Sequence, residues 1–314
     1  MNWLKEELDH GPILGDGAMG TMLLRSGLKP GESAELWNVD RPKAVLSIQE
    51  DYVEAGARFL TTNTFGGTPL ALALHGLAER AAELNSAAVR IAREASRCLN
   101  SPHPTASETS AGPAVEAYSI HVLGDVGPFG GFLEPYGDTT AEEAEEAFRV
   151  QIGAFRDAGA DGIIVETMVD PAELAIAVRV TREFGDWPVL ATYAFQKFGG
   201  SFRTMMGTTV DEAMAAATEA GADAAGANCG TDLGLDDYLR LASELVAAAE
   251  GTPVILQPNA GAPREVDGAV VYSATPADLA NWARQVAEVG VKIVGGCCGT
   301  TPEHIKAMAG ALRG

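Results

Sequence analysis

Gly295-Gly296-Cys297-Cys298-Gly299-Thr300-Thr301-Pro302 is the stretch in which the fold and the chemistry of this sequence meet. The largely apolar residues 291–294 before it predict a buried strand, and Thr301 and Pro302 predict the N-cap and first residue of a helix. Neighbouring side chains of a regular strand point to opposite faces, so both thiols reach one point only where glycines let the backbone bend. Cys229, between Asn228 and Gly230, has the same setting after another apolar run. We therefore interpret the three cysteines as one site at two strand ends.

The same unit, a strand followed by a helix, recurs along the whole chain. Its strands are short and apolar without alternation, as expected for parallel strands that are buried on both faces. Eight such units in 314 residues predict a (β/α)8 TIM-type barrel that forms a single domain over residues 1–314, preceded by a short N-terminal helix. A doubly wound open sheet is the alternative. The predicted strands cover residues 13–14, 58–63, 117–122, 162–167, 188–194, 222–229, 253–259 and 292–298.

Helices are predicted between these strands, and two segments are predicted as loops. Residues 34–40 are expected to form a linker, and residues 101–113, rich in Ser, Thr and Pro, a loop. The predicted helices cover residues 21–26, 42–55, 77–98, 140–158, 171–184, 210–220, 235–250, 276–289 and 302–312.

Composition excludes several classes of function. The chain has 43 acidic and 22 basic residues, a formal net charge of -21, which disfavours nucleic acid and anionic membranes as partners. No apolar run approaches the roughly 20 residues of a membrane span, and no signal peptide pattern opens the chain, so we expect a cytoplasmic protein. Four cysteines in such a chain indicate metal binding or catalysis in preference to disulfides. Cys98, inside a predicted helix, is interpreted as a packing residue.

A barrel assembles its functional groups at the carboxyl ends of its strands. Two carboxylates there, Asp16 and Glu166, would together hold a substrate ammonium group, although a salt bridge in the barrel mouth is the alternative for Glu166. The histidines show no metal-binding spacing. The polar or thiol residues at the predicted strand ends are Asp16, Asn63, Asp125, Glu166, Asn228, Cys229, Asn259, Cys297 and Cys298.

Three cysteine thiolates suit a zinc ion whose fourth tetrahedral position stays open. The alternative is that these cysteines are buried and pack as small apolar groups. Three thiolates leave the zinc centre with a net negative charge, which makes it poor at generating hydroxide. Such a centre is better suited to hold a substrate thiol as the nucleophilic thiolate. The pattern therefore favours alkyl transfer to sulfur over hydrolysis.

The stretch Gly15-Asp16-Gly17-Ala18-Met19-Gly20 matches G-x-G-x-x-G, a pattern of dinucleotide-binding folds. A Rossmann-type oxidoreductase would also need an acidic residue at the end of a second strand about twenty residues later, and Glu35 and Asp40 lie in the predicted linker instead. The other interpretation is that Asp16 faces the site and the glycines let the backbone approach a ligand.

With these motifs in place, the sequence resembles the homocysteine S-methyltransferase family, and within it the homocysteine-binding barrel of cobalamin-dependent methionine synthase. The resemblance implies zinc bound by Cys229, Cys297 and Cys298, with the homocysteine thiol as the nucleophile in the open position. It also implies that Asp16 and Glu166 contact the substrate amino group, that the Gly17 backbone contacts its carboxylate, and that Asn228 belongs to the substrate site beside the metal ligand. The matching stretches are residues 16–23, 35–38, 62–67, 124–128, 165–167, 228–230, 257–261 and 295–304.

The methyl donor is the least determined part of this prediction. Methionine synthase carries folate, cobalamin and reactivation domains after its barrel, and because none follows Gly314 we expect methylcobalamin on a separate corrinoid or folate methyl-donor protein. A self-sufficient enzyme that uses S-methylmethionine or a betaine-type donor is one alternative. A non-catalytic zinc- or thiol-binding subunit of a corrinoid complex is another. Residues 101–113 and 130–138, which would face the donor, match the family poorly.

Overall fold

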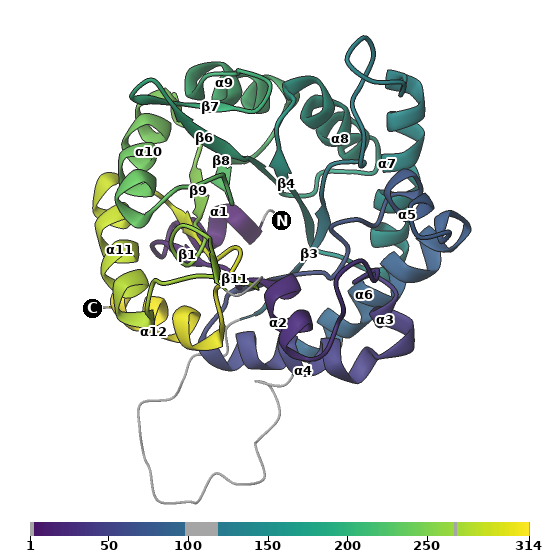
Figure 1. Ribbon diagram of the computed structural model, residues 1–314, viewed down its shortest axis with the longest axis horizontal. Helices are drawn as coiled ribbons and strands as arrows, with labels where there is room; N and C mark the ends of the chain where they lie inside the picture. The colour runs from purple at the N-terminus through teal and green to yellow at the C-terminus, as the bar shows by residue number, and fades with distance from the viewer. Residues whose placement is uncertain (1–2, 98–118, 267–268, 314) are drawn as a thin grey trace, which may run out of the picture.

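A barrel of eight parallel strands organises the computed structural model, which describes residues 3–97, 119–266 and 269–313 (Figure 1). The strand order is β1-β12-β9-β8-β5-β4-β3-β2, and a parallel bridge between Gly15 and Phe59 joins the two outer strands. This closure confirms the (β/α)8 barrel and excludes the doubly wound open sheet. The strands are β1 Ile13–Leu14, β2 Phe59–Thr61, β3 His121–Val126, β4 Gly162–Met168, β5 Val189–Tyr193, β8 Ala224–Asn228, β9 Val254–Gln257 and β12 Ile293–Val294.

Helices form the outer ring of the barrel, and local sequence signals set their ends. Thr140, Thr209 and Thr275 cap three of them at the N-terminus, and each accepts a hydrogen bond from the backbone N–H three residues later. Glycines in the left-handed conformation end several helices, as at Gly56 after α4 and Gly159 after α7. The principal helices are α2 Met19–Arg25, α4 Pro42–Ala55, α6 Ala81–Ala95, α7 Ala141–Ala158, α8 Pro171–Glu183, α9 Val210–Ala220, α10 Leu235–Ala248, α11 Pro276–Val289 and α12 Pro302–Leu312.

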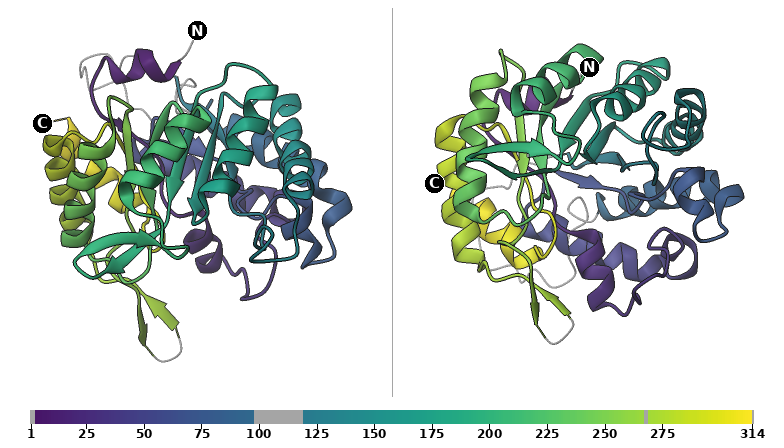
Figure 2. Two further views of the ribbon diagram at one scale, coloured as in Figure 1. Left: turned by 90° about the horizontal axis from the view of Figure 1, so that it is seen from above. Right: turned by 45° about the horizontal axis from the view of Figure 1, so that its top comes forward.

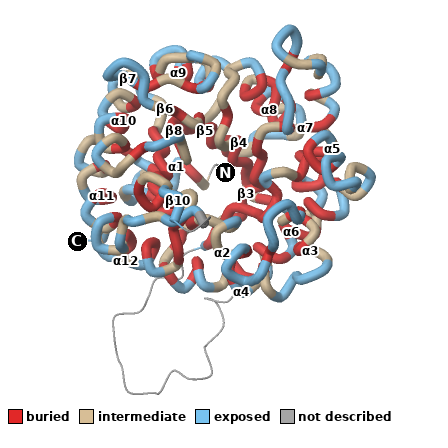
Figure 3. The backbone as a smooth tube through the Cα atoms, viewed as in Figure 1, coloured by how far each residue is buried: buried red, intermediate tan, exposed pale blue. Residues whose placement is uncertain are grey.

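The inside of the barrel is a packed apolar core, which the buried strands of Figure 3 outline. Helix α1, Trp3–Leu8, adds Leu4 to this core and so covers the amino-terminal ends of the strands. In the left view of Figure 2, α1 lies at one end of the barrel and two β-hairpins lie at the other. The interior cluster consists of Leu4, Ile13, Phe59, Leu123, Ile164, Leu190, Ala224, Ile255 and Ile293.

The structure departs from the sequence predictions between the regular units. The predicted linker 34–40 contains the helix α3, Trp37–Asp40, and the predicted helix 77–98 is a 3-10 turn, Ala78–Arg80, followed by α6, while its last residue lies outside the described chain. A further helix, α5 Pro69–Ala73, was not predicted. The predicted loop 101–113 also lies outside the described residues. Helix α3, the 3-10 turn and helix α5 are each too short for a helical period to be recognised in the sequence.

Two hairpins, β6 Phe195–Phe198 with β7 Ser201–Thr204 and β10 Arg264–Val266 with β11 Ala269–Val271, were also missed. The first had a recognisable signal, because Gly199 and Gly200 both have positive φ and a Gly-Gly pair is typical of a two-residue hairpin turn. Strand β3 also runs four residues beyond its predicted end, so it contains Asp125. In the described part of the chain, no helix is long and apolar enough to cross a membrane.

Candidate active site

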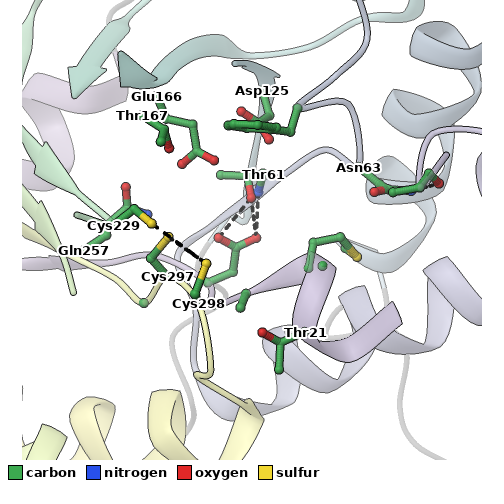
Figure 4. Close-up of a pocket in the computed structure, with 18 of the residues that line it drawn as sticks. Thr21, Thr61, Asn63, Asp125, Glu166, Thr167, Cys229, Gln257, Cys297 and Cys298 are labelled. Atoms are coloured by element: carbon green, nitrogen blue, oxygen red, sulfur yellow. Dashed lines mark hydrogen bonds between the residues drawn. The ribbon is translucent and has the colours of Figure 1, made fainter. Parts of the chain in front are cut away.

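A cavity of about 290 Å³ opens at the carboxyl ends of the barrel strands (Figure 4). This volume is close to the lower end of the range for small-molecule pockets. Most of the polar residues predicted at strand ends line it, whereas two lie behind its wall. The lining residues are Asp16, Asn63, Asp125, Glu166, Cys229, Cys297 and Cys298, and those behind the wall are Asn228 and Asn259.

The three predicted thiols converge on one side of this cavity. The sulfur of Cys298 lies 3.9 Å from that of Cys229 and 4.0 Å from that of Cys297, and all three sulfurs fall within 4.8 Å of one another. Zinc–sulfur bonds of about 2.3 Å in a tetrahedron place sulfurs about 3.8 Å apart. The spacing therefore fits three ligands of one zinc ion, and a fourth position facing the cavity would remain for a ligand.

An unusual backbone conformation turns the Cys229 side chain into the cavity. Cys229 has a φ of 51° and the following Gly230 a φ of 109°, both in the left-handed region. A side chain at Gly230 would stand 2.6 Å from the Phe195 carbonyl oxygen, so only glycine fits there. The Cys229 N–H donates to the Gln257 carbonyl at 3.1 Å, and its own carbonyl accepts from the Tyr238 hydroxyl. Such strained positions gather at functional sites.

Hydrogen bonds also hold the Cys297–Cys298 turn against its neighbours. The Cys297 N–H donates to the Pro258 carbonyl at 2.8 Å, and the Cys298 carbonyl accepts from the Ala260 N–H at 2.9 Å. The Thr300 hydroxyl donates to the Cys297 carbonyl at 2.7 Å. Because these bonds use main-chain atoms, they leave both sulfurs free to face the cavity.

Asp16 is the first of the carboxylates in the cavity, and it is nearly fully buried. It accepts hydrogen bonds from the Thr61 N–H at 2.7 Å and from the Thr61 hydroxyl at 3.1 Å. Burial raises its pKa to about 7, although the Thr61 bonds oppose this shift. The Asp16 carbonyl accepts from the Gly296 N–H at 2.9 Å, which ties the glycine-rich turn to the cysteine turn. This turn therefore belongs to the cavity, as the second interpretation of the glycine pattern expected.

The next residue, Gly17, also lines the cavity. A side chain on Gly17 would stand 2.8 Å from the Thr300 hydroxyl and 2.9 Å from the Tyr52 ring, so the chain packs too closely there for any other residue. The Thr300 hydroxyl also accepts from the Ala18 N–H at 3.0 Å. The bare backbone at Gly17 is thus presented to the cavity on a rigid turn.

Glu166 faces the same cavity from the end of β4. Burial raises its pKa to about 8, and the neighbouring Cys229 and Asp16 add to the shift. Its carboxylate accepts a hydrogen bond from the Asn228 side chain at 3.1 Å. No salt bridge to Glu166 occurs among the described residues. The alternative role for Glu166, a salt bridge in the barrel mouth, therefore has no basic partner there.

Asn228 is fully buried and reaches the cavity only through its neighbours. Its carbonyl oxygen accepts from the Thr167 N–H and the Thr192 hydroxyl, both at 2.8 Å. Its amide nitrogen lies 3.1 Å from the Glu166 carboxylate and 3.8 Å from the Cys297 sulfur. This placement suits a residue that orients a carboxylate and a metal ligand together. Asn259 has no such link, because its side chain donates to the Gly230 carbonyl.

Glu35 lines the cavity as well, although the sequence placed it in a linker. It accepts from the Ser33 hydroxyl at 2.7 Å and from the Gly66 N–H at 2.9 Å. Its place in a recognisable motif, residues 35–38, was the only signal for it. Gln257, which ends β9, was missed because the predicted strand 253–259 ran past it and Asn259 was taken as the residue at the strand end.

The cavity therefore gathers acidic side chains that have no basic partner among its described lining residues. Asp16, Glu35, Asp125 and Glu166 line it, and no Lys, Arg or His is among its described lining residues. Burial raises the pKa of Asp125 well above its usual range, and the nearby Glu166 and Asp16 carboxylates add to this shift. A ligand with a positive group would relieve this repulsion.

Comparison with known proteins places this geometry in a family. Residues 13–312 match the model of the family described as homocysteine S-methyltransferase. Methionine synthase from Mycobacterium tuberculosis is 32% identical over 322 aligned residues, which cover 98% of this chain and 25% of that protein. The Mycobacterium leprae methionine synthase is 31% identical with the same coverage. The chain thus spans about a quarter of the length of these curated relatives.

A solved structure shows the same fold. The homocysteine methyltransferase MmuM from Escherichia coli, in its metallated form, superposes with a TM-score of 0.79 and 24% sequence identity. The superposition covers 98% of this chain and 99% of the other.

Proposed function

The chain belongs to the homocysteine S-methyltransferase family, and from this premise we propose that it transfers a methyl group to the thiolate of homocysteine to give methionine. The membership confirms the family and the class of enzyme expected from the sequence. The observation that carries the finer proposal is that three thiols at zinc-binding spacing share one cavity with carboxylates, and that the described lining of this cavity includes no basic side chain.

In this proposal Cys229, Cys297 and Cys298 hold the zinc ion. When bound, zinc supplies a positive charge that keeps the substrate thiol deprotonated at neutral pH, so this thiol needs no general base from the chain. The thiolate sulfur then attacks the methyl carbon in line. A sulfur–carbon bond forms, the bond between methyl and donor breaks, and its electron pair leaves with the donor.

The chain itself would orient the amino acid part of the substrate. Asp16 and Glu166 accept hydrogen bonds from the ammonium group, and the backbone of Gly17, which lines the cavity, contacts the carboxylate. Asn228 holds Glu166 from behind, so its contribution is to position the carboxylate. Because these groups stand on strand ends of a rigid barrel, they would hold the sulfur in one place relative to the donor.

Methylcobalamin on a partner protein is the methyl donor that we propose. The likeness to two mycobacterial methionine synthases, 32% and 31% identical to this chain, supports this choice. S-methylmethionine and betaine are the small donors to test against it. A non-catalytic thiol-binding subunit would transfer no methyl group from any of them.

Metal content and zinc-edge X-ray absorption of the purified protein, before and after addition of homocysteine, test the acceptor half. We expect one zinc ion in a sulfur-rich shell that gains one sulfur from homocysteine. Methionine formation with methylcobalamin, S-methylmethionine or betaine then tests the donor half. A shell that does not respond to homocysteine would refute the proposal.

A further inference from the structure

Asp125 is the one carboxylate of the cavity whose side chain makes no hydrogen bond in the described structure. It is 5% exposed, and its Oδ1 is buried without a partner. By contrast, Asp16, Glu35 and Glu166 each accept at least one hydrogen bond from the protein. Buried polar atoms in native proteins are nearly always paired, so an unpaired carboxylate that lines a cavity indicates a ligand with a donor.

The fold does not need this carboxylate. All hydrogen bonds of Asp125 run through its backbone: its N–H donates to the Thr62 hydroxyl at 3.0 Å, and its carbonyl accepts from the Thr64 hydroxyl at 2.7 Å and from the Gln151 amide at 3.3 Å. Any residue except proline could make these bonds. They also fix the main chain at this point, so the side chain stands on a rigid base.

The strand register places Asp125 with the other two carboxylates that face the substrate. Asp125 pairs with Ile164 on β4, and Glu166 stands two residues further along that strand, on the same face. Asp16 is bound to Thr61 of β2, and β2 in turn pairs with β3. Figure 4 draws Glu166 between the cysteines and Asp125, with Asp125 farther from the cysteines. Carboxylates from β1, β3 and β4 thus surround one region.

We infer that Asp125 is the third acceptor for the substrate ammonium group, beside Asp16 and Glu166, and that it selects thiols that carry a free primary amine. A primary ammonium has three N–H donors, which matches three carboxylates. It also brings the positive charge that the described lining lacks. This inference rests on the proposed function, because the amine is that of homocysteine.

The test compares two thiols that differ only in the amine. Calorimetry measures the binding of homocysteine and of 4-sulfanylbutanoate, which lacks the amino group, to the zinc-loaded wild type and to Asp125→Asn. A charge-assisted hydrogen bond contributes about tenfold to hundredfold in affinity. We expect Asp125→Asn to lose at least about tenfold for homocysteine and to bind 4-sulfanylbutanoate within about twofold of wild type.

Two controls accompany this comparison. Asp236→Asn makes the same chemical change at an exposed residue outside the cavity and is expected to alter neither affinity. Zinc content reports whether the variant keeps the metal site. If Asp125→Asn does not fold, Asp125→Ala takes its place with the same expected result, because the backbone bonds of residue 125 remain.

The outcomes separate this inference from the function on which it rests. Equal losses for both thiols, or no loss for either, would overturn the role of Asp125 while the wild type still binds homocysteine through zinc. A wild type that binds both thiols equally would also overturn it. A wild type that binds neither thiol would overturn the proposed function and this inference together.

Discussion

The two ends of the barrel handle charge in opposite ways. At the amino-terminal ends of the strands, the acidic side chains are paired with basic ones. Both carboxylate oxygens of Glu7 accept hydrogen bonds from Arg58, at 2.7 and 2.8 Å, and Asp161 forms an ion pair with Arg93. At the carboxyl ends, the buried Asp16, Glu35 and Asp125 and the half-buried Glu166 face a cavity whose described lining includes no basic side chain. We call the amino-terminal end, where the acids are paired, the closed end of the barrel. We call the carboxyl end, where the acids face a cavity, the open end.

Aromatic and apolar packing follows the same division. The Trp3 ring stacks on His121 at 4.0 Å, and Leu4 fills the barrel core beneath it. At the opposite end, Thr167 and Cys229, two of the four non-glycine residues with positive φ in the described part of the chain, line the cavity. Strain and unpaired charge thus gather where function is proposed, and their cost is carried by the packed remainder.

Removal of one thiol should have the largest effect. We expect Cys298→Ala to lower the zinc content from one equivalent to near zero and to reduce methyl transfer on the order of a thousandfold or more, because the metal contributes several kcal/mol to the reaction. Elemental analysis and a methionine assay measure both. Cys98→Ala, at a cysteine predicted to lie outside the site, is the matched control. Full zinc content in Cys298→Ala would contradict the three-thiol assignment.

The closed end should affect stability alone. Leu4 is 1% exposed in the barrel core, so Leu4→Ala is expected to lower the free energy of unfolding by about 2–5 kcal/mol through lost contacts and a cavity. Homocysteine affinity should stay unchanged. Urea unfolding and calorimetry measure the two quantities. Leu24→Ala, at a leucine that is 53% exposed, is the control and should change stability little. Weakened homocysteine binding in Leu4→Ala would show that the two ends are coupled.

Much of this contrast could be predicted from the sequence, for a physical reason. Buried parallel strands are apolar throughout, so a polar residue or thiol at the end of a run stands out, as Asp16, Glu166 and the three cysteines did. Their convergence follows from the barrel, because all strands end at the same rim.

What could not be predicted depends on contacts between distant segments. Asn228 was predicted in the substrate site, but its place behind Glu166 depends on the packing of β4 against its neighbours. Glu35 enters the cavity because Ser33 and Gly66 hold it, and Gly66 is 31 residues away. That Asp125 lacks a partner is likewise a property of three-dimensional structure, which no local pattern records.

A buried acid at the open end should cost stability in a pH-dependent way. Burial raises the pKa of Asp16 from 3.8 to about 7, so the native state holds its proton more tightly than the unfolded state does. The zinc-free wild type should therefore lose stability as pH rises from about 4 to about 7. We expect Asp16→Asn to gain on the order of 1–3 kcal/mol relative to wild type between pH 4 and pH 8, because the lost Thr61 bonds offset part of the relief.

Urea unfolding at the two pH values measures this difference, and Asp236→Asn, an exposed acid, should show none. The same Asp16→Asn variant should bind homocysteine at least about tenfold more weakly once zinc is restored. A stability difference that does not change with pH would mean that Asp16 is not the buried, costly acid that distinguishes the open end.

The ion pair at the closed end should have the smallest effect, and this is the finest test of the contrast. Glu7 and Arg58 are each about 20% exposed in their side chains, so water screens their attraction. We expect Glu7→Gln to lower the free energy of unfolding by about 1 kcal/mol or less, and by less still in 1 M salt. Its effect should not depend on homocysteine, because no ligand is needed to complete this pair. A change in homocysteine affinity in this variant would show that the paired charges serve the site, and the division between the two ends would fail.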